Sequence, residues 1–155
     1  MAKYRDLTLE ELQELEKEFV DFLVLNGIDS EDWVNIKKEK SEKAEGIISA
    51  FSDVVFQKIL MQCRYIEKYT SRSITAIFCD KNKMHLQRIE LPEDAPYDLL
   101  NKEDFEKLKT EVDVELEYSK GEKEYAGDRE LEIYKMLESG FIISNQKLYM
   151  SLFEE

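Results

Sequence analysis

The residues of this 155-residue chain best suited to chemistry are two cysteines, Cys63 and Cys79, and one histidine, His85. A thiolate activated by an imidazole is a common enzyme nucleophile, and Cys79 and His85 flank a predicted hairpin turn. Opposite residues of a hairpin share a face, so a turn with an odd number of residues would set Cys79 beside His85. A turn with an even number would instead pair Cys79 with Met84 or Leu86. We expect the even turn, with Cys79 as a small buried apolar residue and His85 as a half-exposed sheet residue.

A row of carboxylates is the second candidate for chemistry. Asp113, Glu115 and Glu117 alternate with apolar residues from 112 to 118, which predicts a half-buried strand with one acidic face. The carboxylates would lie about 7 Å apart along the strand, and glycosidase or cation chemistry uses such pairs. However, the chain has 35 Asp and Glu residues, so a row of this kind is expected by chance. We therefore interpret it as a solvated face and keep a small enzyme as the less favoured alternative.

The sequence predicts no cofactor and no metal. Its five glycines form neither a Gly-x-Gly-x-x-Gly motif nor a phosphate-binding loop followed by Lys and Ser or Thr. One histidine and two separated cysteines cannot complete a zinc ligand set without carboxylates from elsewhere. We assign no catalytic, cofactor-binding or metal-binding residue.

The segment from Arg64 to Leu91 is basic within an acidic chain. It holds six Lys and Arg against three Asp and Glu, a balance of +3, whereas the rest of the chain sums to −16 and the whole chain to −13. Aromatic residues lie in the same segment, and a sheet that presents aromatic rings among cations can bind single-stranded RNA by stacking and phosphate attraction. The candidate binding residues of this segment are Arg64, Lys68, Arg88, Tyr65 and Tyr69.

Two interpretations of the basic segment stay open. It binds RNA or a small anion, or its cations pair with acidic helices of the same molecule or with a second copy of the chain. The surrounding acidic residues repel polyanions and no RNA-binding signature is present, so nucleic acid is the less favoured partner. A helix-turn-helix at the C-terminal end would offer only Lys147 as a cation in its recognition segment, which argues against DNA binding.

We expect a non-enzymatic protein-interaction module whose ligand is a protein partner or a second copy of the chain. The missing catalytic set and the strongly acidic composition favour this class. The contact residues would be aromatic side chains framed by charge, namely Trp33, Phe56, Tyr65 and Tyr69. Residues of these types are more often found in a core than at an interface.

Three helices are predicted in the first part of the chain. Thr8 and Glu11 form a capping box that begins the first helix, which extends to about residue 26. A short helix carries Trp33, and an apolar pattern over residues 44–63 predicts a longer, central helix. The opposite side of this central helix is small or polar and faces either solvent or a close neighbour. Its residues are Gly46, Ser49, Ala50, Asp53 and Gln57.

The fold class is predicted as α+β: N-terminal helices packed on a small antiparallel sheet, followed by a further strand and C-terminal helices. The sheet is predicted as a meander of three β-prone runs. These runs are residues 65–69, 73–79 and 84–91. The strand 112–118, a turn region at 121–127 and two helices follow. The length fits one domain, residues 1–155.

The sequence predicts a cytoplasmic protein. Its N-terminus lacks the apolar stretch and the cleavage site of a secretory signal, and two cysteines form no disulfide framework. No apolar run approaches the roughly 20 residues of a membrane span. We therefore expect reduced thiols and no membrane partner.

Several short strings occur in an order that resembles a protein family. They are Lys3-Tyr4-Arg5 with Leu7-Thr8, Glu18-Phe19 through Asn26-Gly27-Ile28, Phe51-Ser52-Asp53, and Glu138-Ser139-Gly140 before Ser144. Over nearly its whole length the chain resembles a family of uncharacterised bacterial proteins of about this size, found chiefly in Bacteroidota. The resemblance implies a bacterial cytoplasmic source and an α+β domain. It implies no site residues, because none of the strings has a known chemical role.

Overall fold

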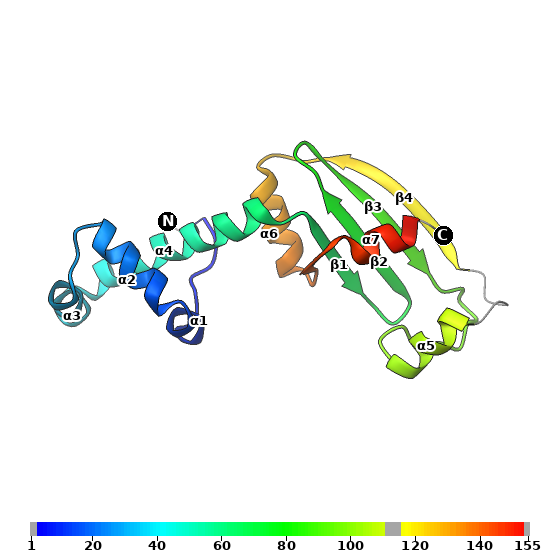
Figure 1. The fold of residues 1–155 in the computed structure, drawn as a ribbon, viewed down its shortest axis with the longest axis horizontal. Helices are drawn as coiled ribbons and strands as arrows, with labels where there is room; N and C mark the ends of the chain where they lie inside the picture. Colours follow the sequence, from blue (N-terminus) through cyan, green and yellow to red (C-terminus); the bar gives the residue numbers. More distant parts are fainter. Residues whose placement is uncertain (1–2, 111–115, 154–155) are drawn as a thin grey trace. The chain divides into compact units, whose positions relative to one another are not determined.

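The computed structural model describes residues 3–110 and 116–153, which adopt an α+β fold (Figure 1). The chain forms two compact units, which we call the helical unit, residues 1–61, and the sheet unit, residues 62–155. The α+β class is confirmed, and the prediction of a single domain stays a prediction. Among the described residues, no helix combines the length and the apolar character that a bilayer span requires.

The helical unit is built from α1 (Leu9–Glu14), α2 (Glu16–Leu25), α3 (Ser30–Glu39) and α4 (Ser41–Gln62). The predicted capping box begins α1, because the Glu11 amide donates to the Thr8 hydroxyl and the Thr8 amide donates to the Glu11 carboxylate at 2.9 Å. The predicted single first helix was wrong, since the chain breaks at Leu15 into α1 and α2. Neither Gly nor Pro marks this break in the sequence.

The small and polar side of α4 binds the N-terminal segment of the same chain. The Asp53 carboxylate accepts the Tyr4 amide at 2.9 Å, and the Tyr4 hydroxyl donates to Gln57 at 2.6 Å. The Leu7 amide donates to the hydroxyl of Ser52, which is fully buried. Of the two alternatives for this side of the helix, a close neighbour is therefore correct over part of its length.

The sheet unit contains a five-stranded antiparallel sheet in the order β4-β3-β2-β1-β5. Its strands are β1 (Tyr65–Tyr69), β2 (Ser73–Cys79), β3 (Lys83–Glu90), β4 (Glu117–Glu124) and β5 (Ile142–Ser144). The first three confirm the predicted meander. Residues 121–124 continue β4, so the prediction that a turn begins at 121 was wrong. Of the predicted acidic row, Glu117 begins β4, and Asp113 and Glu115 lie outside the described residues.

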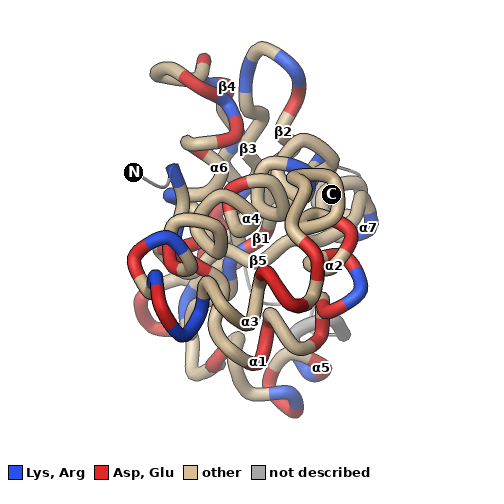
Figure 2. Tube along the Cα trace, turned by 90° about the vertical axis from the view of Figure 1, so that its left-hand side faces the viewer, with Lys and Arg blue, Asp and Glu red and all other residues tan. Residues whose placement is uncertain are grey.

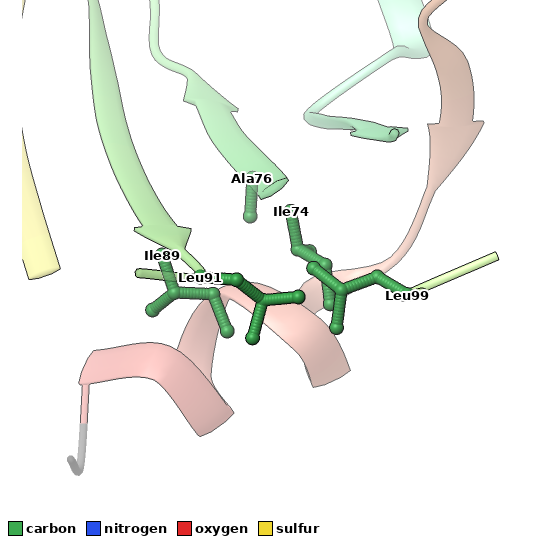
Figure 3. Close-up of a cluster of buried hydrophobic side chains, with 5 residues drawn as sticks. All are labelled: Ile74, Ala76, Ile89, Leu91 and Leu99. Atoms are coloured by element: carbon green, nitrogen blue, oxygen red, sulfur yellow. The ribbon is translucent and has the colours of Figure 1, made fainter. Parts of the chain in front are cut away.

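Three helices complete the sheet unit: α5 (Lys102–Thr110), α6 (Arg129–Glu138) and α7 (Gln146–Phe153). The terminal helix α7 crosses one face of the sheet over β2 and β3 (Figure 1). Leu148 and Tyr149 of α7 pack against a core cluster on this face. The cluster consists of Ile74, Ala76, Ile89, Leu91 and Leu99 (Figure 3). Helix α6 lies against the other face, where Met136 lines a hollow with Ile77 and Met84.

Arg72 stabilises the loop that follows β3 by hydrogen bonds. Its guanidinium donates to the carbonyl oxygens of Pro92, Ala95 at 2.9 Å and Tyr97 at 3.2 Å. Backbone bonds on either side of this contact join Leu91 and Leu99 to the β1–β2 turn. Arg72 therefore binds the protein's own backbone. One of the six cations of the basic segment thus stabilises the fold.

Candidate functional site

A groove of about 840 Å³ lies between α2, α3 and α4 of the helical unit. Phe22, Ile36 and Ile47 contribute its apolar lining. Gly46 and Ala50 of α4 add little bulk, and a Cβ placed on Gly46 would meet no atom within 4 Å. The small residues of α4 thus leave room that a larger side chain would fill.

The helical unit combines exposed aliphatic side chains with acidic charge. On α2, Val24 is 65% and Leu25 is 86% exposed, and Val34 of α3 is also exposed. Residues 6–21 hold seven Asp and Glu and one Lys, and Figure 2 shows acidic positions along α1 and α2. The groove itself is lined by charges of both signs, namely Asp32, Glu39, Lys40 and Lys43.

The two aromatic contact residues predicted in the helical unit serve its packing. Trp33 is half-buried and meets the edge of Phe19 at 5.2 Å between ring centroids. Phe56 is half-buried between Tyr4, whose ring centroid is 6.0 Å away, and the Arg5 guanidinium, 4.9 Å from the Phe56 ring. Neither of them lines the groove, whose apolar lining comes from aliphatic residues and Phe22.

Two of the three predicted cationic binding residues lie in one row of the sheet. Thr75 pairs with Lys68 of β1 on one side and with Arg88 of β3 on the other, and Arg88 pairs with Ser119 of β4. Directly opposite residues share a face, so these four side chains form a polar row across four strands. We call Lys68, Thr75, Arg88 and Ser119 the cationic row.

Hydrogen bonding in the cationic row is incomplete. Arg88 binds the Glu90 carboxylate at 2.6 Å, and Lys68 lies 3.4 Å from the Ser139 carbonyl oxygen. The Arg88 Nε is buried, and it has no hydrogen-bond partner among the described residues. A buried donor without a partner is costly, because it has lost its hydrogen bonds to water.

The predicted aromatic residues lie on the opposite face of the sheet from the cationic row. Tyr65 pairs with Phe78 and Tyr69 with Ile74, and both pairs alternate with the row that contains Lys68. Tyr65 stacks on Phe78 at 5.1 Å and is approached by Tyr149 of α7. Arg64 precedes β1 and lies exposed beside Cys63, outside the row. The structure therefore does not bring the rings and the cations of the basic segment together.

The register of β2 and β3 confirms the even turn. Cys79 pairs with Met84, and His85 pairs with Phe78, so the thiol and the imidazole point to opposite faces. Cys79 is fully buried, while His85 is partly exposed and stacks on Phe78 at 5.7 Å. His85 faces the Glu122 carboxylate at 3.4 Å. No Cys79–His85 pair is present.

The partner of Cys79 is the other cysteine, which sequence reasoning missed. Both thiols are free and buried, each shifts the pKa of the other, and the Cys63 thiol lies 3.8 Å from the Tyr65 carbonyl oxygen. The interaction with the Cys79 thiol and the charge of Arg129 lower the pKa of Cys63 to about 7, although its burial opposes this. The same interaction, together with burial, raises the pKa of Cys79. The two cysteines lie in different segments, so no spacing motif in the sequence indicates the contact.

Arg129 is the second residue of this site that the sequence did not reveal. It begins α6, and its guanidinium donates to the backbone carbonyl oxygens of Cys63, of Cys79 at 2.9 Å and of Asp80 at 3.1 Å. A basic residue in the first turn of a helix opposes the helix dipole, which is a weak sequence signal for a tertiary role. No group of three or more His, Cys, Asp or Glu in the described part of the chain is arranged to hold a metal ion.

The chain belongs to a family of unknown function, DUF6495, which matches residues 1–155. No curated protein and no solved structure matches it. The predicted likeness to an uncharacterised family is therefore confirmed.

Proposed function

We propose that this member of a family of unknown function is a non-enzymatic module that binds a helical segment of a partner protein. The observation that carries the proposal is the groove between α2, α3 and α4, with its apolar lining and its space above Gly46. Grooves between helices commonly accept the apolar side of an amphipathic helix. The acidic charge of α1 and α2 favours a partner segment that carries basic residues on its other side.

The groove supports a partner of this chemistry better than a small metabolite. Its lining is apolar over Phe22, Ile36 and Ile47, and charges of both signs occur around them, as in an interface with an apolar centre and a polar rim. Val24 and Leu25 of α2 are also exposed, although neither lines the groove. We also propose a bacterial, cytoplasmic setting, which the two free thiols support.

Filling the groove at Gly46 should abolish partner binding. A photo-crosslinking amino acid at Asn35, an exposed groove residue, should give one major adduct in cells that produce the protein. Gly46→Leu should reduce the yield of this adduct at least about tenfold, because the added side chain occupies the groove. Mass spectrometry of the adduct identifies the segment that is bound.

Gly46→Ala is the matched control for this experiment. Alanine and leucine both raise helix propensity relative to glycine by up to about 1 kcal/mol, so neither change should unfold α4. The alanine variant should keep its adduct. An adduct that survives Gly46→Leu contradicts the proposal. An adduct between two copies of the chain also contradicts it, because the groove would then mediate self-association.

The cationic row carries a second candidate function, the binding of a small anion such as phosphate. Lys68 and Arg88 pair with Thr75 from either side, and the buried Arg88 Nε donates no hydrogen bond to the described residues. The placement of Tyr65 and Tyr69 on the other face supports a small anion over RNA, since stacking and phosphate contacts would fall on opposite sides.

Phosphate titration tests the anion candidate. Phosphate should raise the melting temperature of the wild-type protein, and the combined variant Lys68→Gln and Arg88→Gln should weaken the effect at least about tenfold in concentration. The control combines Lys81→Gln and Lys147→Gln, which removes the same charge outside the cationic row. An equal loss in both double variants means that only the overall charge matters, which excludes a site in the row.

A further inference from the structure

The two cysteines of the chain lie together although they come from separate segments. Cys63 lies between α4 and β1, and Cys79 is the last residue of β2. The Cys79 amide donates to the Arg64 carbonyl at 2.6 Å, so the backbone next to Cys63 runs alongside Cys79. The side chains are 4% and 0% exposed, and both thiols are free.

Arg129 holds the two cysteine backbones in place from a third element. One guanidinium nitrogen, Nη2, donates to the carbonyl oxygens of both Cys63 and Cys79, and Nε donates to the carbonyl oxygen of Asp80. These bonds tie the backbones of both cysteines to the first residue of α6. They also keep a permanent positive charge next to the sulfur atoms, which favours a thiolate.

We propose that Cys63 and Cys79 are a redox pair that a peroxide converts to an intramolecular disulfide and that a dithiol reductant restores. This inference does not depend on the proposed partner groove, because both residues belong to the sheet unit. The proposal assigns a site of reversible modification to Cys63 and Cys79. From the sequence alone, these residues are two separate buried thiols.

The chemistry proceeds in two steps. The Cys63 thiolate attacks one oxygen of the peroxide, the O–O bond breaks, and Cys63 becomes a sulfenic acid while the leaving oxygen takes a proton and departs as water. The Cys79 sulfur then attacks the Cys63 sulfur, the S–O bond breaks, and the hydroxyl leaves as water with the Cys79 proton. Two thiols lose two electrons and hydrogen peroxide is reduced to two waters. A dithiol reverses the bond by thiol–disulfide exchange.

The environment assigns different roles to the two sulfurs. Cys63 has the lowered pKa, about 7, because it interacts with the Cys79 thiol and lies near the Arg129 charge. Cys79 has a raised pKa and stays protonated until the second step. Burial of both side chains excludes bulky oxidants, so hydrogen peroxide should react faster than glutathione disulfide.

Single serine variants test the assignment of roles. Cys79→Ser keeps a hydroxyl that can donate to Cys63, and it should accumulate a sulfenic acid at Cys63 that dimedone traps. Cys63→Ser leaves only Cys79, and its trapping rate at pH 7 should be at least about tenfold lower, because a thiol with a pKa of 8.5 or more is only a few per cent ionised. The trapping rate of Cys79→Ser should rise with pH around a midpoint near the Cys63 pKa, about 7. Equal rates in the two variants overturn the roles.

The wild-type protein tests the disulfide without any substitution. After peroxide, intact mass should fall by two hydrogen atoms, both thiols should resist alkylation under denaturing conditions, and dithiothreitol should restore them. Disulfides between chains, or independent oxidation of the two thiols to sulfinic acids, overturn the proposal. So does a folded protein that stays reduced at peroxide concentrations that oxidise the unfolded chain.

Discussion

Replacing Ile74 with alanine should lower the free energy of unfolding of the sheet unit by about 2 to 5 kcal/mol, the usual cost of truncating a buried isoleucine. Ile74 is 1% exposed and lies in the core cluster with Ile89, Leu91 and Leu99 (Figure 3). The cluster joins the sheet to the loop after β3. The cavity left by the alanine would therefore weaken the packing of both. Urea unfolding followed by circular dichroism measures the change.

The same substitution at Ile142 is the matched control for Ile74. Ile142 lies in β5 at the edge of the same sheet and is 54% exposed, so its truncation should change the free energy of unfolding by no more than about 0.5 kcal/mol. If both variants lose the same amount, burial in the core cluster is not what stabilises the sheet unit.

Replacing Arg72 with alanine should cost about 3 kcal/mol of unfolding free energy. Hydrogen bonds that involve a charged group contribute about 1.5 to 3 kcal/mol each, and the carbonyl oxygens of Pro92, Ala95 and Tyr97 would regain part of this by hydration. The loop after β3 should loosen first. Amide hydrogen exchange of Leu99, whose amide donates to Ser71, should therefore accelerate more than that of the strands.

Two further variants define the cause of the Arg72 effect. Arg72→Lys keeps the charge but not the planar group that reaches three carbonyls, so it should recover only part of the stability. Lys81→Ala removes an exposed cation from the β2–β3 turn and should change the free energy of unfolding by less than about 0.5 kcal/mol. Full recovery with lysine would show that charge alone accounts for the effect.

Local sequence patterns predicted much of the secondary structure correctly. The Thr8–Glu11 capping box, the meander from Tyr65 to Glu90 and the terminal helix follow from spacing and capping within a few residues. The sequence also favoured the arrangement in which Cys79 and His85 are not paired, and the register of β2 and β3 confirms it. These features depend on interactions between residues a few positions apart, so they can be predicted from the order of the residues.

The sequence did not predict how the candidate binding residues are arranged, because the charge of a segment does not say on which face of the sheet each side chain lies. Lys68 and Arg88 share one face of the sheet, whereas Tyr65 and Tyr69 share the other. Successive side chains of a strand point to opposite faces, so neighbours in the sequence are separated. Arg72, counted among the same cations, binds the protein's own carbonyl oxygens. Pairing between strands decided which of these residues meet.

The sequence by itself determined the α+β class, the capped start of the first helix and the three-stranded meander of this protein, since each depends on short-range patterns. Only the tertiary structure decided that Gly46 opens onto a groove, that Lys68 and Arg88 flank Thr75, and that Arg129 joins Cys63 to Cys79. Each of these contacts joins segments distant in the chain. Their formation depends on which buried surfaces pack together, and no local spacing encodes that choice.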